Sequence, residues 1–79
     1  MSTDYERTFR AEVLKECLAS IAGLSLDLGT KSGENLAFQA GTLANQLLLP
    51  EYNSDFALNQ AEKQYQEFKN KYEKLKKGV

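Results

Sequence analysis

The fold is decided by the last third of the chain, residues 54–79, SDFALNQAEKQYQEFKNKYEKLKKGV. Apolar side chains recur there at alternating spacings of three and four residues: Leu58, Ala61, Tyr65, Phe68, Tyr72, Leu75 and Val79. Glutamates and lysines fill the positions between them, so the pattern is typical of a coiled-coil seam with a solvated back. It predicts a helix over residues 54–77, with Asn53 or Ser54 as its cap.

A second helix is predicted near the start of the chain, over residues 4–28. Thr3 and Glu6 have the spacing of a capping box, and one apolar face follows, made of Phe9, Val13, Leu14, Cys17, Leu18 and Ile21. The pattern continues past Gly23, so we expect the helix to pass this glycine and to end where Gly29 takes the left-handed conformation. Residues 24–28 also alternate between apolar and polar, and a short strand is the alternative there.

The middle of the chain predicts a helix over residues 34–49 that has no charges on its outer face. Residues 30–33 form the expected connector, Ser32 or Gly33 can cap the helix, and Pro50 closes it. From residue 35 to residue 50 the chain has no charged side chain. The outer face consists of Phe38, Gln39, Thr42, Asn45, Gln46 and Leu49. We expect a face of this composition to be covered for part of the time.

These helices predict an all-α fold in one domain over residues 1–79, either a three-helix bundle or a long helical hairpin. The first and third helices, of about 25 and 24 residues, are too long for a middle helix of about 16 residues to cover. We therefore expect a homo-oligomer, with a frayed monomer as the alternative. The expected interface residues are Phe38, Gln39, Thr42, Asn45, Leu49, Leu58, Tyr65, Phe68, Tyr72 and Leu75.

Composition excludes several classes of function. The chain has 79 residues, a net charge of −1, a single cysteine (Cys17) and no histidine. It therefore lacks an intramolecular disulfide, a histidine-dependent catalytic site and a multi-cysteine metal site, and we expect neither an enzyme nor a cofactor. Cys17 is expected in the core of a protein from a reducing, cytoplasmic setting. No segment predicts a secretion signal or a membrane anchor.

The lysine-rich tail, from Lys69 to Lys77, is the one feature that favours nucleic-acid binding. Its aromatic residues fall on the apolar seam, whereas stacking on bases requires exposed rings. The structural interpretation of the tail is therefore favoured over a nucleic-acid partner, and nucleic-acid binding through this lysine-rich helix is kept as an alternative function.

An anion site is a further candidate in the segment Gly29–Gly33, which precedes a helix. The segment differs from a nucleotide-hydrolysing phosphate loop, because Thr30 stands where that motif requires a glycine. Free amides at the helix start, together with Thr30, Lys31 and Ser32, nevertheless suit an anion. Arg7 or Arg10 of a neighbouring subunit are expected to complete the site. A plain connector with a helix cap is the alternative.

The segment Leu36-Ala37-Phe38-Gln39-Ala40-Gly41, running on to Leu49-Pro50 after an apolar helix and a short loop, resembles the helical hairpin of small phage proteins that sequester cyclic-nucleotide immune signals. The resemblance covers less than half of the chain. It implies an oligomer whose subunit interfaces hold phosphate-bearing ligands. The residues themselves favour a helical interaction protein, an adaptor or inhibitor with a protein partner, and ligand sequestration is the alternative.

Overall fold

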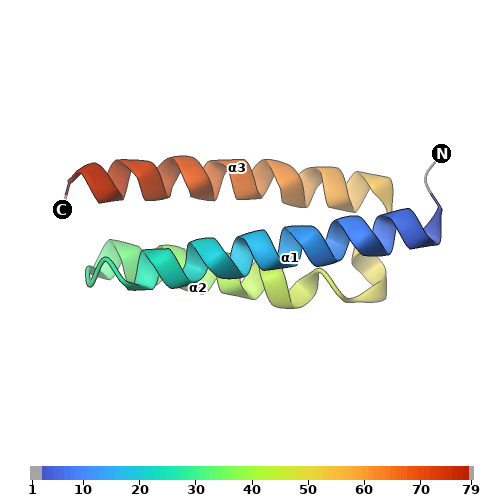
Figure 1. Cartoon of the computed structure of the whole chain (residues 1–79), viewed down its shortest axis with the longest axis horizontal. Coiled ribbons are helices and arrows are strands. Elements are labelled where there is room, and N and C mark those ends of the chain that lie inside the picture. The colour runs from blue at the N-terminus through green and yellow to red at the C-terminus, as the bar shows by residue number, and fades with distance from the viewer. Residues whose placement is uncertain (1–2, 79) are drawn as a thin grey trace.

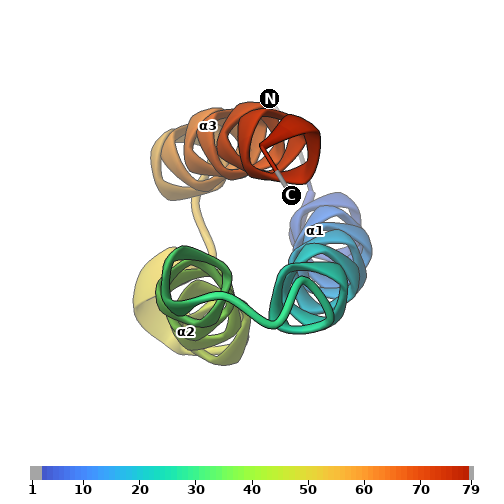
Figure 2. The same cartoon turned by 90° about the vertical axis from the view of Figure 1, so that its left-hand side faces the viewer.

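The computed structural model describes residues 3–78 and contains three α-helices that lie side by side (Figure 1). They are α1 (Asp4–Leu26), α2 (Lys31–Gln46) and α3 (Asp55–Lys77), and a short 3-10 helix, η1 (Pro50–Tyr52), precedes α3. Helices α1 and α3 run in the same direction and α2 runs opposite to both. Seen from one end, the helices occupy the corners of a triangle (Figure 2). Residues 3–78 include no strand, so the all-α prediction with three helices is confirmed.

Helix α1 begins and continues as its sequence predicts. The Thr3 hydroxyl accepts a hydrogen bond from the Glu6 amide at 3.1 Å, and the Glu6 carboxylate accepts one from the Thr3 amide at 3.3 Å. The helix passes Gly23 and ends at Leu26, two residues before the predicted end, because the amides of residues 28 and 29 bond to carbonyls three residues earlier. Gly29 has the predicted positive φ, 69°. A strand over residues 24–28 is excluded.

Helix α2 begins at Lys31, three residues before the predicted start. Thr30 is its cap, and the Thr30 hydroxyl accepts a hydrogen bond from the Gly33 amide at 3.0 Å. The prediction of a cap at Ser32 or Gly33 was wrong because the buried Gly33 packs against the end of α1 and belongs to the helix. Helix α2 ends at Gln46 and not at Leu49, since the chain is extended before Pro50 and η1 begins there.

Helix α3 begins after Ser54, whose hydroxyl accepts a hydrogen bond from the Ala57 amide at 3.1 Å. Its apolar seam faces the other two helices. Leu58, Ala61 and Phe68 are buried, and Tyr65, Tyr72 and Leu75 are partly buried against the core. The seam position predicted at Val79 lies outside the described residues.

The core lies between the three helices, and its fully buried leucines are Leu18, Leu47 and Leu58. Helix α1 packs more closely against α2 than against α3. Only part of the apolar face predicted for α1 is consequently buried: Phe9 is 58% exposed and Val13 is 43% exposed. These two side chains lie at the edge of α1 where α3 does not cover them.

Candidate functional site

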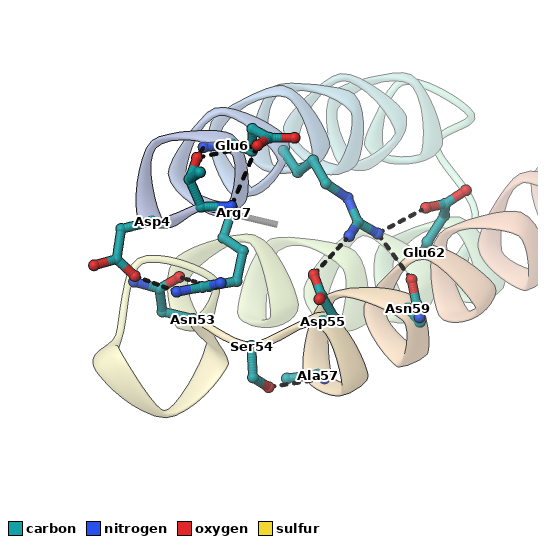
Figure 3. Close-up of polar contacts among 11 residues, drawn as sticks. Asp4, Glu6, Arg7, Asn53, Ser54, Asp55, Ala57, Asn59 and Glu62 are labelled. Atoms are coloured by element: carbon teal, nitrogen blue, oxygen red, sulfur yellow. Dashed lines mark hydrogen bonds and ion pairs between the residues drawn. The ribbon is translucent and has the colours of Figure 1, made fainter. Parts of the chain in front are cut away.

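The two arginines predicted to bind an anion, Arg7 and Arg10, connect α1 to the start of α3. Figure 3 labels Arg7 and the side chains that these contacts reach. Arg7 donates a hydrogen bond to the Asn53 side chain at 3.0 Å and also pairs with Asp4. Arg10 makes three contacts with side chains of α3. It reaches Asp55 at 3.4 Å, Asn59 at 2.8 Å and Glu62 at 3.5 Å. Both guanidinium groups therefore have partners within their own chain.

The other predicted anion ligands lie at the opposite end of α1. Thr30 caps α2, while Lys31 and Ser32 are exposed in its first turn. The length of α1 separates Thr30 from Arg7 and Arg10 by roughly 25–30 Å. One chain therefore does not bring the five predicted ligands together. Ser32 instead lines a groove between α2 and α3, together with Asn35, Gln39, Lys71 and Lys74. No local sequence pattern predicts this grouping, because it depends on how α3 packs against α2.

Four of the predicted interface residues form an exposed surface, the outer face of α2, made of Phe38, Gln39, Thr42 and Asn45, while Leu49 is exposed beyond the end of the helix. Phe38 is 74% exposed. The Thr42 hydroxyl donates a hydrogen bond to the Phe38 carbonyl at 2.7 Å, so it is already satisfied within the helix. This leaves an aromatic ring among uncharged amide side chains, with no charged group between residues 35 and 50.

The predicted interface residues of the third helix are placed differently. Leu58 and Phe68 are buried inside the chain, and Tyr65, Tyr72 and Leu75 are partly buried. The seam therefore contacts α1 and α2 of its own chain. We expected another subunit to cover this seam, whereas helices of the same chain cover much of it. The apolar periodicity is the same in both cases, so it does not distinguish them.

A groove between α1 and α3, the α1–α3 groove, is a surface that the sequence reasoning missed. Phe9, Val13 and Leu24 line it from α1, while Tyr65 and Tyr72 line it from α3. Its signal in the sequence was weak: on a helical wheel Leu24, Val13 and Phe9 lie roughly 120–180° around the helix from Leu18, outside the face that Leu18 centres.

Cys17 and Tyr65 lie at the centre of the α1–α3 groove and are both partly buried. Burial raises the pKa of the Tyr65 phenol above its ordinary value, and the charge and hydrogen bonding of Cys17 add to this rise. The contact of Cys17 with Tyr65 therefore stabilises the neutral phenol.

No protein-family model, curated protein or solved structure matches this chain. Within residues 3–78, no helix is long and apolar enough to cross a bilayer. In the same part of the chain, no three acidic or thiol side chains are close enough together to hold a metal ion. The structure is that of a small three-helix protein. It has two exposed surfaces that are rich in uncharged or apolar side chains, the outer face of α2 and the α1–α3 groove.

Proposed function

We propose that this chain is a non-catalytic interaction protein, an adaptor or inhibitor, that self-associates and binds a macromolecular partner through the outer face of α2. The observation that carries the proposal is the exposure of Phe38 on a helix face without charges. Aromatic side chains are enriched among residues that dominate binding energy, whereas charged residues are depleted at interface centres. A reducing, cytoplasmic compartment suits a chain with one cysteine.

The polar groups of this face support a protein partner. Gln39 and Asn45 offer amide donors and acceptors, which can pair with a partner's backbone or side chains without the cost of desolvating a charge. Gln46 is less available, because its side chain accepts a hydrogen bond from the Tyr52 hydroxyl at 3.0 Å. The partner that fits best presents an apolar pocket for Phe38 surrounded by uncharged polar groups.

Site-specific photocrosslinking in the cells that make the protein tests this proposal. A photoreactive phenylalanine analogue replaces either Phe38 or Phe56, which are 74% and 75% exposed and therefore form a matched pair. We expect a crosslinked partner from position 38 and not from position 56. We also expect Phe38→Ser to weaken binding to that partner by roughly tenfold or more. Equal crosslinking at the two positions, or none at position 38, would contradict the proposal.

A second candidate function is sequestration of a small phosphate-bearing ligand, such as a cyclic nucleotide. The groove between α2 and α3 favours it, because Lys71 and Lys74 lie there with Ser32 beside the start of α2. Two ammonium groups and a helix N-terminus all stabilise negative charge. Ser32, Lys71 and Lys74 all belong to one chain, whereas the predicted site with Arg7 and Arg10 requires two chains.

Calorimetric titration with mononucleotides and cyclic nucleotides tests the second candidate. Binding should weaken by about tenfold in the Lys71→Gln variant and in the Lys74→Gln variant. It should be unchanged in Lys63→Gln, since this exposed lysine does not line the groove. An absence of heat with the unmodified protein would remove the candidate for these ligands.

A further inference from the structure

The α1–α3 groove exposes an apolar strip along α1 that Glu16 and Ser20 interrupt between Val13 and Leu24. Phe9, Val13 and Leu24 are 58%, 43% and 46% exposed, and the strip from Phe9 to Leu24 is about 22 Å long. Tyr65 and Tyr72 extend the apolar surface onto α3. Apolar patches of this extent on a small protein commonly mark contact surfaces.

Opposite charges stand along the α3 side of this groove. Glu62 lines one half of it and Lys69 lines the other half. They are two helical turns apart on the same side of α3, about 10 Å, which is too far for them to pair with each other. Glu62 contacts Arg10 at 3.5 Å, whereas Lys69 makes no ion pair within residues 3–78. Lys69 is therefore available to a group that covers the groove, and the Glu62 side chain, which is 61% exposed, can accept a second cation while it contacts Arg10.

We propose that a second copy of this chain docks antiparallel on the α1–α3 groove, related by a two-fold axis that crosses both helices. In such a dimer α1 faces the partner's α1 and α3 faces the partner's α3. An axis between residues 16 and 17 of α1 places Phe9 opposite the partner's Leu24. The two ends of the apolar strip then cover each other.

The same axis pairs the charges of α3. Arg10 reaches Asp55, Asn59 and Glu62, and Asn59 is the middle one of the three, so Arg10 and Asn59 stand at about the same height along the bundle. Because α1 and α3 run in the same direction, residues that follow Arg10 and Asn59 by the same number of positions also stand at the same height. Residues 16 and 17 of α1 therefore lie beside residues 65 and 66 of α3. An axis between residues 65 and 66 places Glu62 opposite the partner's Lys69, and Lys69 opposite the partner's Glu62. A single two-fold axis therefore covers both ends of the apolar strip and brings Glu62 and Lys69 of the two chains together in two opposite-charge pairs.

A parallel dimer lacks this complementarity. Its two-fold axis would run along the groove and would set α3 against the partner's α1, with residues of equal height facing each other. Lys69 would then face the partner's uncharged Ser20. The charges of the groove therefore favour an antiparallel second copy over a parallel one, because opposite charges face each other only in the antiparallel arrangement. The inference rests only on the self-association part of the proposed function and uses a different surface from Phe38.

Charge reversal with restoration tests the proposed dimer. Sedimentation equilibrium should give twice the chain mass of 8.9 kDa for the unmodified protein. Glu62→Lys alone, or Lys69→Glu alone, turns two opposite-charge pairs into two like-charge pairs, so the dissociation constant should rise roughly tenfold or more. The chain that carries both reversals should dimerise again. An equimolar mixture of the two single variants, one of them isotope-labelled, should form heterodimers in native mass spectrometry.

The matched control reverses Glu67 and Lys74, which have the same charges and the same spacing on α3 but do not line the α1–α3 groove. These variants should dimerise as the unmodified protein does, and so should Phe38→Ser. Circular dichroism checks that every variant keeps its helices. A monomeric unmodified protein, a double reversal that stays monomeric, or equal weakening by the control pair would overturn the inference. Loss of partner binding in Phe38→Ser with an intact dimer separates this inference from the α2 surface.

Discussion

Gly33 lies directly against the backbone of Ser25, since a Cβ atom at Gly33 would be 2.4 Å from the Ser25 carbonyl oxygen. This contact joins the first turn of α2 to the last turn of α1. It allows the two helices to approach closely beside the turn at Gly29. A backbone oxygen held in a helix cannot move aside as a flexible side chain can, so this position requires glycine.

Replacing Gly33 with alanine should therefore destabilise the protein. We expect Gly33→Ala to lower the free energy of unfolding by about 1–3 kcal/mol, because the added methyl group overpacks the contact. Gly41→Ala is the matched control, since a Cβ atom there meets no atom within 4 Å. The control should raise the free energy of unfolding by about 0.5–1 kcal/mol through helix propensity. Urea denaturation measures both values, and changes of the same sign would contradict the packing argument.

Replacing Ser25 with alanine should stabilise the protein. The Ser25 side chain is fully buried, and its hydroxyl has no hydrogen-bond partner among residues 3–78. Removing an unsatisfied buried hydroxyl should raise the free energy of unfolding by about 1 kcal/mol in addition to the gain in helix propensity. Ser20→Ala, at an exposed position of the same helix, shows the propensity gain alone. Equal stabilisation by the two substitutions would argue against an unsatisfied hydroxyl.

The Tyr65 phenol should titrate above the ordinary tyrosine range. Its pKa is raised mainly by burial and further by Cys17. A difference titration of phenolate absorbance between the unmodified protein and Tyr65→Phe isolates this group. In Cys17→Ala the Tyr65 pKa should move part of the way back toward its ordinary value, whereas in concentrated urea the whole shift should vanish.

The raised pKa of Tyr65 also predicts the sign of a pH effect on stability. The folded state holds this proton more tightly than the unfolded state, so the contribution is fully present below the ordinary tyrosine pKa of about 10. It is lost as pH rises through the raised value in the folded protein. Unfolding in urea at a series of alkaline pH values should show a shallower loss of stability for Tyr65→Phe. Parallel curves for the two proteins would contradict the assignment.

The proposed dimer brings the two Glu16 side chains toward each other beside the two-fold axis. Glu16 is exposed and lines the α1–α3 groove. Glu16→Gln removes this like-charge repulsion and should lower the dissociation constant of the dimer by about threefold. Glu12→Gln, at an exposed position of α1 outside the groove lining, should leave it unchanged. If sedimentation shows no gain for Glu16→Gln, the axis does not pass where we place it.

Local signals determined the start of α1, the start of α3 and the turn after α1. The Thr3 and Glu6 capping box, the cap at Asn53 or Ser54 and the left-handed Gly29 depend on groups within one turn of each other, so the sequence predicted them, and the structure places the α3 cap at Ser54. The start of α2 was different. Thr30 caps it through a local hydrogen bond from the Gly33 amide. Gly33, which was predicted to lie in the connector, is inside the helix and packs against Ser25, and no local pattern contains this contact between two helices.

The sequence by itself also determined that the three helices carry apolar faces that must be covered. Only the tertiary structure decided what covers each face. Leu58 and Phe68 are buried within their own chain, while Phe9 and Val13, which lie roughly 140–180° around α1 from the buried Leu18, remain exposed. The physical reason is that periodicity records which side of a helix avoids water, whereas burial depends on the distance and rotation of the neighbouring helices.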